Sequence, residues 1–295
     1  MARLFASIKE LSMKKLNYLL LILCISCGEK EAANPVDFLK ENAIPIKDIS
    51  KLNQQVYQEI SDYDVIMVGE MHGTKEPAEF VYGLCNLITE SEDKVVLALE
   101  IRASQMENLS NEMSIAQLKE LDFFRRENFD GRNGVSMLDL IYNSIQNEKI
   151  ILKFIDNYYP SSPRDSSMYM EIRNIRKMYP DSKIVTLTGN VHNSMTPLFD
   201  KERIAGYLLK DTANFDPKKI MSIHHAYSEG TMFNNDGRGI KIRDIDREEN
   251  IYNTTLSHEM FLSEKFPEEQ NQYTHVLYTD KVTASGKIEK DDNNR

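Results

Sequence analysis

A carboxylate and an imidazole that could share a proton lie two residues apart in the first third of the chain. Glu70 and His72 follow an apolar run, 65–68, that is typical of a strand buried on both faces. In extended backbone, side chains two residues apart project to the same side. Gly69 and Gly73 bracket the pair, so the backbone can turn tightly and a ligand can come close. We therefore expect Glu70 and His72 to face one site at the end of a strand.

More polar and ionisable side chains follow the other apolar runs of the chain. Glu100 and Arg102 come after a second run and Asp156 after a third, while Asn190 and His192 come after a fourth. In a parallel sheet, the carboxyl ends of the strands face one crevice. Two separate runs end in Gly-polar-x-His, and helix capping alone does not explain that repetition. The sequence therefore predicts that these residues join the first pair in one site.

Two kinds of chemistry suit this set of side chains. Glu70, His72 and His192 could bind a divalent metal ion through nitrogen and oxygen atoms, although the sequence does not identify the metal. The same three residues with Glu100 could instead act without a metal, as general acid and base. A carboxylate and an imidazole in a shared, partly desolvated site shift each other's pKa, which favours proton transfer.

The candidate substrate-binding residues are Arg102, Asn190 and Asp156. The leading interpretation is a hydrolase that cleaves an ester or amide bond of a small molecule or peptide with the help of a metal ion. One member of the first pair would activate water, while His192 and Arg102 would hold the developing oxyanion or the metal. The sequence contains no Gly-x-Ser-x-Gly elbow, so no serine nucleophile is proposed.

Four apolar runs predict the strands that position these side chains, and helical patterns lie between them. The order indicates an α/β fold, with a mostly parallel central sheet flanked by helices and with helical insertions. Because a helix connects the first two strands, a right-handed crossover and a parallel pair are expected. The predicted strands are 64–68, 94–99, 149–155 and 183–188, and the predicted helices are 36–42, 50–60, 76–90, 114–128, 136–146 and 165–179.

The last third of the chain has a less regular pattern. Residues 203–209 and 219–226 are predicted as further strands, 229–239 as a loop and 273–278 as a final strand. The second of these strands contains two adjacent histidines, which point to opposite faces of a strand. At most one of the two is therefore expected to face the site.

The N-terminus has the pattern of a bacterial lipoprotein signal peptide. A basic segment, 13–15, precedes a short apolar core, 18–25, and Ser-Cys-Gly follows at 26–28. Cleavage before Cys27 and lipidation of its thiol would export the protein and anchor it to a membrane, in the periplasm or on the outer surface; the alternative is an ordinary cleaved signal peptide. The expected organisation is a signal peptide at 1–27, a tether at 28–35, a single α/β domain at 36–284 and a disordered tail at 285–295.

Charge and cysteine content narrow the classes of partner. The formal net charge is −10, which argues against nucleic acid because that ligand requires a basic face. Besides the lipidated cysteine, Cys85 is the one thiol expected in the mature chain, so no intramolecular disulfide is expected. Cys85 lies in an apolar helical pattern and is predicted to be a buried core residue. The expected partners are the substrate and a membrane reached through the lipid.

Three motifs in a fixed order carry a resemblance to a known superfamily. They are Gly-Glu-Met-His-Gly-Thr-x-Glu at 69–76, Val-Leu-Ala-Leu-Glu at 96–100 and Gly-Asn-x-His at 189–192. Together they resemble the superfamily that joins erythromycin esterase-like enzymes, ChaN-like haem-binding lipoproteins and Tiki/TraB proteins. The His-Gly-Thr of the first motif is closer to the esterase-like branch.

The resemblance implies an α/β core and a role for each matched residue. Glu70 and His72 would be the acid/base or ligand pair, Glu100 a second carboxylate and His192 the partner imidazole. Membership in so diverse a superfamily does not name a substrate.

The resemblance also implies an alternative function, in which the protein is a ChaN-like lipoprotein that binds haem or a metal for uptake. Histidine and tyrosine are suitable ligands for haem iron, and Tyr158 and Tyr159 follow the third predicted strand. The sequence contains no Cys-x-x-Cys-His, so the usual covalent attachment of haem is not expected.

Overall fold

The computed structural model describes residues 34–126, 130–157, 159, 162–235, 237, 239–247, 251–254, 259–266 and 271–289. The predicted signal peptide, Cys27 and most of the tether lie outside the described residues, as does Tyr158. The helices are α2 (Pro35–Asn42), α3 (Gln54–Ile60), α4 (Glu76–Ser91), α5 (Ile115–Lys119), α6 (Asp122–Arg125), α7 (Val135–Gln146), α8 (Arg164–Met178) and α9 (Ile204–Lys210), with short 3-10 helices η1 (Ala103–Asn108), η2 (Asn190–Asn193), η3 (Pro217–Lys219) and η4 (Ile251–Thr254).

A nine-stranded, mostly parallel sheet forms the centre of the protein, which confirms the predicted α/β class. Six strands run parallel in the order β9-β6-β2-β5-β3-β4, and β8 and β1 continue the sheet antiparallel beyond β9. The strands are β1 (Ile44–Pro45), β2 (Val65–Glu70), β3 (Val95–Arg102), β4 (Ile150–Asp156), β5 (Lys183–Gly189), β6 (Ile220–Asn235), β7 (Ile240–Ile245), β8 (Met260–Glu264) and β9 (His275–Val282).

Helices cover both faces of the sheet because alternate residues of each strand point to opposite faces. In β2, Ile66 and Val68 belong to the core shared with α4 and α7, whereas Val65 and Met67 belong to the core shared with α8 and α9. All four side chains are at most 1% exposed. This two-sided burial explains why the strand reads as one continuous apolar run.

The expected pairing of the first two core strands was wrong. Strands β2 and β3 are parallel, but β5 lies between them and pairs with both. This order places the carboxyl ends of β2, β5 and β3 side by side. The residues that follow these three strands are therefore neighbours in space, although they are far apart in sequence.

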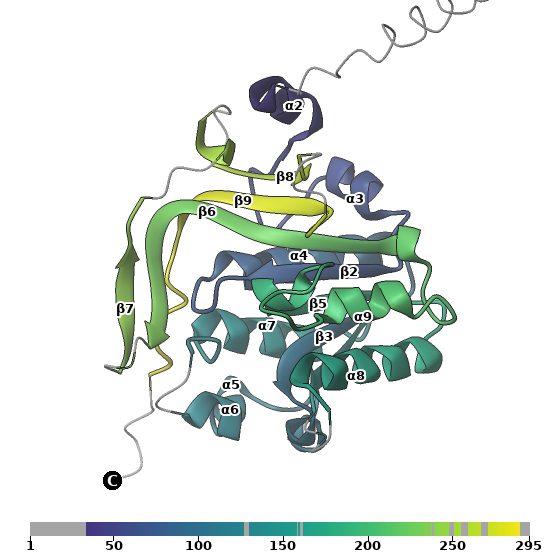
Figure 1. Ribbon diagram of the computed structural model, residues 1–295. Coiled ribbons are helices and arrows are strands. Elements are labelled where there is room, and N and C mark those ends of the chain that lie inside the picture. The colour runs from purple at the N-terminus through teal and green to yellow at the C-terminus, as the bar shows by residue number, and fades with distance from the viewer. Residues whose placement is uncertain are drawn as a thin grey trace, which may run out of the picture.

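Strand β6 is longer than predicted and bends beyond the sheet (Figure 1). Its first part pairs with β2 and β9, and its last part, from Gly230, pairs with β7 as an antiparallel ribbon. The expected loop at 229–239 was therefore wrong for residues up to 235. The ribbon reaches the loop after β2, where the Phe233 amide donates to the Gly73 carbonyl at 2.9 Å.

Two other predictions differ from the structure. Residues 203–209 were expected to form a strand, but 204–209 belong to helix α9. The buried residues Ile204, Ala205 and Leu208 fit the spacing of one helical face. Such a short apolar run does not distinguish a strand from a buried helix. The expected helix at 114–128 is two short helices, α5 and α6, and its last two residues lie outside the described ones.

Segments assigned to the tether and the tail contact the domain. Pro35 is the first residue of α2, and Leu39 of that helix is fully buried. The Ser285 hydroxyl lies 2.6 Å from that of Ser136, and the Gly286 carbonyl accepts from the Val135 amide at 3.2 Å. Within the part of the chain that is described, no helix has the length and apolarity needed to cross a membrane.

Candidate active site

Glu70 and His72 form a hydrogen-bonded pair at the carboxyl end of β2. Glu70 Oε1 lies 2.9 Å from His72 Nδ1, and the Glu70 side chain is buried whereas the His72 ring is 23% exposed. Burial opposes protonation of the ring, but the adjacent Glu70 carboxylate outweighs this effect and raises the pKa of His72 above 6.5. When the ring is neutral, a hydrogen on Nδ1 donates to Glu70 and leaves the lone pair on Nε2.

The loop that carries His72 is fixed by backbone contacts on two sides. Gly73 has a φ of +89°, which favours glycine, and its carbonyl accepts from the Phe233 and Ser285 amides at 2.9 and 2.7 Å. A Cβ at Gly73 would overlap the Phe233 carbonyl. The β6–β7 ribbon and the segment after β9 therefore set the position of the imidazole.

The two predicted histidines both lie next to Gly189, at the end of β5. A Cβ built on Gly189 would be 3.0 Å from His72 Cε1 and 3.5 Å from His192 Cδ2. No side chain separates the two imidazoles at this point, because position 189 is a glycine. The structure thus brings together the two Gly-polar-x-His motifs that the sequence singled out.

Glu100 is the centre of a buried ionic cluster. Its Oε1 lies 2.6 Å from both Arg132 Nη1 and Arg164 Nη2 and 3.5 Å from His192 Nε2, and its Oε2 accepts from the Gly189 amide at 2.8 Å. The side chain is 2% exposed. Burial alone would raise the pKa of Glu100, but His192 and Arg132 hold it well below its usual value. Glu100 is therefore negatively charged at neutral pH and faces His192.

His192 is held between two carboxylates. Its Nδ1 lies 2.6 Å from Asp165 Oδ1, its Nε2 faces Glu100, and the ring is only 10% exposed. Burial lowers the pKa of His192, but the bonds to Asp165 and Glu100 outweigh it and raise the pKa to about 9. Arg203 Nη1 holds the second oxygen of Asp165 at 3.2 Å. His192 is therefore an imidazolium at neutral pH.

The three predicted substrate-binding residues have different positions. Asp156 ends β4 and accepts two hydrogen bonds from Arg164, so it lies in the cluster. The Asn190 amide instead pairs with the backbone N–H and carbonyl of His225, at 2.9 and 3.0 Å, and joins η2 to β6. Arg102 is exposed and lies outside the cluster, because a bulge between Leu99 and Arg102 interrupts the alternation of β3.

Four charged residues of the cluster were missed by the sequence reasoning. None of them directly follows a predicted strand: Arg132 lies in a turn, Arg164 and Asp165 begin α8, and Arg203 precedes α9. One signal was present in the sequence for Arg132, since Gly131 and Gly134 bracket it as glycines bracket His72. Arg132 binds Asp130 with Nε and Nη2 and reaches Glu100 with Nη1.

The donor set does not fit the predicted divalent metal. Glu70 is paired with Nδ1 of His72, and both nitrogens of His192 face carboxylates. The guanidinium groups of Arg132 and Arg164 both contact Glu100, and two such cations oppose the binding of a third. Among the described residues, no group of three or more His, Cys, Asp or Glu side chains is arranged to hold a metal ion.

Tyr159, which the sequence suggested as a haem ligand, has a hydrogen-bond partner of its own. The Tyr159 hydroxyl donates to Glu171 at 2.8 Å, and Asn157 bonds to the same carboxylate.

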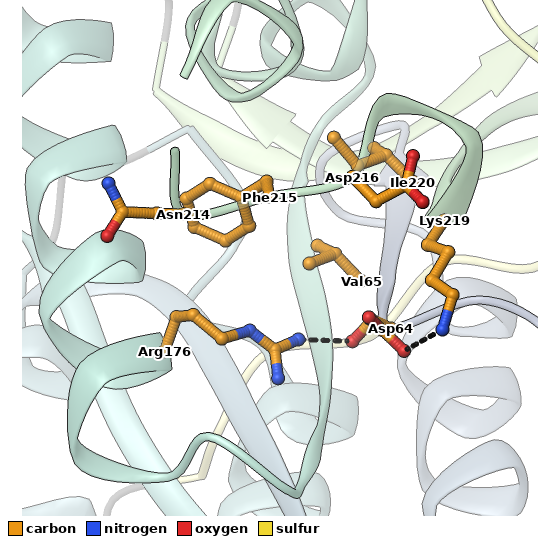
Figure 2. Close-up of a pocket in the computed structure, with 8 residues that line it drawn as sticks. All are labelled: Asp64, Val65, Arg176, Asn214, Phe215, Asp216, Lys219 and Ile220. Atoms are coloured by element: carbon orange, nitrogen blue, oxygen red, sulfur yellow. Dashed lines mark hydrogen bonds and ion pairs between the residues drawn. The ribbon is translucent and has the colours of Figure 1, made fainter. Parts of the chain in front are cut away.

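A small pocket lies at the opposite, amino edge of the sheet (Figure 2). Its wall includes Asp64, which lies between Arg176 of α8 and Lys219 of η3, with its carbonyl 3.0 Å from the guanidinium and its carboxylate 3.7 Å from the ammonium. None of the predicted site residues lines this pocket. The carboxyl edge, where the histidines and carboxylates meet, is the better candidate for a reaction.

Solved structures of other proteins share this fold, although no protein-family model and no curated protein matches the sequence. A Bacillus cereus protein has a TM-score of 0.65 at 11% identity, covering 86% of this chain and 98% of its own. A succinoglycan biosynthesis protein has a TM-score of 0.59 at 10% identity, and the match covers 88% of this chain and 100% of that protein. A mutant of the erythromycin esterase EreC in its open conformation has a TM-score of 0.55 at 11% identity, and the match covers 81% of this chain and 97% of the esterase. At such identities the likeness establishes the fold, which this chain shares with an erythromycin esterase.

Proposed function

We propose that the protein is a hydrolase of ester bonds in which His72 is the general base and Glu70 orients it. The observation that carries the proposal is the 2.9 Å bond between Glu70 Oε1 and His72 Nδ1 on a partly exposed ring. Among the described residues, no hydrogen-bond partner faces His72 Nε2. A carboxylate that fixes the tautomer and a ring nitrogen with a lone pair that can accept a proton are what a water-activating base needs.

The reaction would proceed in two steps. Water adds its oxygen to the ester carbonyl carbon and gives a proton to His72 Nε2, while the carbonyl electrons move to the oxygen and form an oxyanion. The oxyanion then re-forms the C=O bond and expels the alkoxide, which takes the proton from His72. The products are a carboxylic acid and an alcohol, and the base is regenerated.

The charges around the histidines suit this sequence of steps. His72 must be neutral to accept a proton, and His192 carries a positive charge below a pKa of about 9. A buried cation near the forming oxyanion stabilises the transition state more than the neutral substrate. We therefore expect a bell-shaped pH–rate profile, with His72 setting the acid limb and His192 the alkaline limb.

The substrate class is proposed as a small-molecule or peptide ester. The named activity of one structural relative, an erythromycin esterase, is consistent with ester cleavage on this fold. The lipoprotein pattern at Cys27 would place the reaction outside the cytoplasm, at a membrane surface. Release of a Cys27→Ala variant from the membrane fraction would test that location separately.

The proposal is tested by turnover of a probe panel with the purified full chain. The panel holds 4-nitrophenyl acetate, 4-nitrophenyl butyrate, erythromycin and alanine 4-nitroanilide, so esters and an amide are compared. We expect turnover of at least one ester, and a loss of about 10²- to 10⁴-fold in kcat for His72→Gln.

Two controls complete this experiment. His224→Gln, which alters a histidine stacked on Tyr273, should keep wild-type turnover. Dialysis against EDTA should leave the rate unchanged. Equal rates for wild type and His72→Gln would contradict the proposal, and a Soret band on haem titration that is lost in His72→Ala would favour the uptake alternative.

A further inference from the structure

Among the described cations of the cluster, the one whose side chain reaches the surface is an arginine that contacts His192. Arg164, the first residue of α8, has a side chain that is 43% exposed. The other described cations of the cluster, Arg132, His192 and Arg203, are between 6% and 10% exposed. Of these groups, Arg164 is the one that a bound substrate can touch without rearrangement of the core.

The hydrogen bonds of Arg164 fix its plane and leave one nitrogen with spare donor capacity. Nε donates to Asp156 Oδ1 at 3.2 Å, and Nη2 donates to Asp156 Oδ2 at 2.9 Å and to Glu100 Oε1 at 2.6 Å. These bonds use all the hydrogens on Nε and Nη2. The neighbour of Nη1 is His192 Nε2 at 3.3 Å.

Nη1 has a hydrogen to donate whichever state His192 adopts. If the His192 ring is neutral, Nε2 accepts one of the two Nη1 hydrogens, and the second has no acceptor among the described residues. If the ring is protonated, Nε2 accepts neither. The guanidinium stays charged in both cases, because Asp156 and Glu100 outweigh the effect of burial and raise the pKa of Arg164.

We propose that Arg164 is a catalytic residue whose Nη1 donates to the carbonyl oxygen of the substrate and to the oxyanion that forms from it. The inference rests on the proposed ester hydrolysis. It gives Arg164 the role of oxyanion donor that the sequence analysis had assigned to Arg102. A donor held by two carboxylates is preorganised, so it needs no rearrangement when the negative charge develops. His192 contacts Arg164 and lies next to Gly189, and His72 also lies next to Gly189.

Steady-state kinetics of Arg164 variants with 4-nitrophenyl butyrate or erythromycin tests the inference. Arg164→Gln should lower kcat by about 10²- to 10³-fold, with KM changed much less, because the bond forms mainly in the transition state. Arg173→Gln is the matched control, since Arg173 lies on the same helix with a side chain that is 42% exposed and pairs with Asp211 outside the cluster. We expect this control to keep wild-type kcat.

Chemical rescue separates a direct role from a structural one. In Arg164→Ala, millimolar guanidinium chloride should restore kcat at least tenfold, and it should not do so in His72→Gln. A protein that has merely lost an ion pair would not gain activity in this way.

The outcomes of the kinetic test distinguish a failure of the Arg164 inference from a failure of the proposed ester hydrolysis. Wild-type turnover that is retained within twofold in Arg164→Gln, or the absence of guanidinium rescue in a folded Arg164→Ala protein, would overturn the inference alone. A wild-type protein that turns over no member of the panel would overturn the proposed function and the inference with it.

Discussion

Asp165 Oδ1 lies 2.6 Å from His192 Nδ1, and Arg203 holds the other oxygen of the same carboxylate. This contact joins the start of α8 to the 3-10 helix after β5, so the position of His192 depends on the packing of α8 against the sheet. It also places a second carboxylate against a ring whose Nε2 already faces Glu100. His192 is therefore kept positively charged by two carboxylates from different elements.

Asp165→Asn should move the alkaline limb of the pH–rate profile to lower pH. His192 loses a charged partner, so its pKa falls from about 9 and the imidazolium is lost earlier as pH rises. A shift of about one pH unit is expected for the loss of one adjacent carboxylate. The measurement is kcat/KM between pH 5 and 10, with Asp37→Asn on the surface of α2 as the control. An unmoved alkaline limb would show that His192 does not set it.

Glu100→Gln should destabilise the fold strongly. The substitution leaves Arg132, Arg164 and His192 around a neutral amide, and breaking a buried ion pair in this way costs about 3 kcal/mol or more in the free energy of unfolding. Urea denaturation at pH 7 measures the loss, and Glu79→Gln, whose side chain is 40% exposed, should change stability by no more than about 0.5 kcal/mol.

Glu100 should also make the stability of the fold depend on pH. The pKa of Glu100 in the folded protein lies well below 4.5, so its contribution is fully present above pH 4.5 and is lost as pH falls through the folded pKa. The difference in stability between wild type and Glu100→Gln should therefore shrink below pH 4.5. A difference that stays constant down to pH 2 would argue that the carboxylate is not paired as described.

Gly189→Ala should reduce activity more than stability. The new methyl group would lie 3.0 Å from His72 Cε1, so the imidazole must shift by a few tenths of an ångström relative to Glu70. Displacement of a base by about 1 Å can cost on the order of 10²-fold in rate, so this smaller shift should lower kcat by less than that. In α9, the atoms nearest to a methyl group at Gly206 belong to the Glu202 side chain, outside the cluster, so Gly206→Ala should leave kcat unchanged. Full activity in Gly189→Ala would contradict the proposed position of His72.

The sequence predicts the site residues that come directly after the core strands. Glu70, His72, Glu100 and His192 all come after long apolar runs, and the rule that parallel strand ends share one edge is enough to bring them together. The structure confirms the α/β class and places all four at that edge. The roles of the four residues and the lipidation of Cys27 stay predictions.

The remaining parts depend on packing between segments that are distant in sequence. Arg132 and Arg164 reach Glu100 from a turn and from a helix start, and neither position has a periodic pattern that reveals its partner. Arg102 was predicted from strict alternation, which the bulge in β3 removes. The metal interpretation did not consider the guanidinium groups beside Glu100, because Arg132 and Arg164 were not assigned to the site.

The most direct test of the account is the pH–rate profile of Glu70→Gln beside that of the wild type, with the panel ester that the wild type hydrolyses. Glu70 raises the pKa of His72 above 6.5. The rate falls as pH drops through this raised pKa, because the base becomes protonated. Removing the carboxylate should lower kcat by about 10²- to 10⁴-fold and move the acid limb to lower pH, whereas Glu79→Gln should change neither. If Glu70→Gln keeps the wild-type kcat and the wild-type acid limb, Glu70 and His72 are not the catalytic pair.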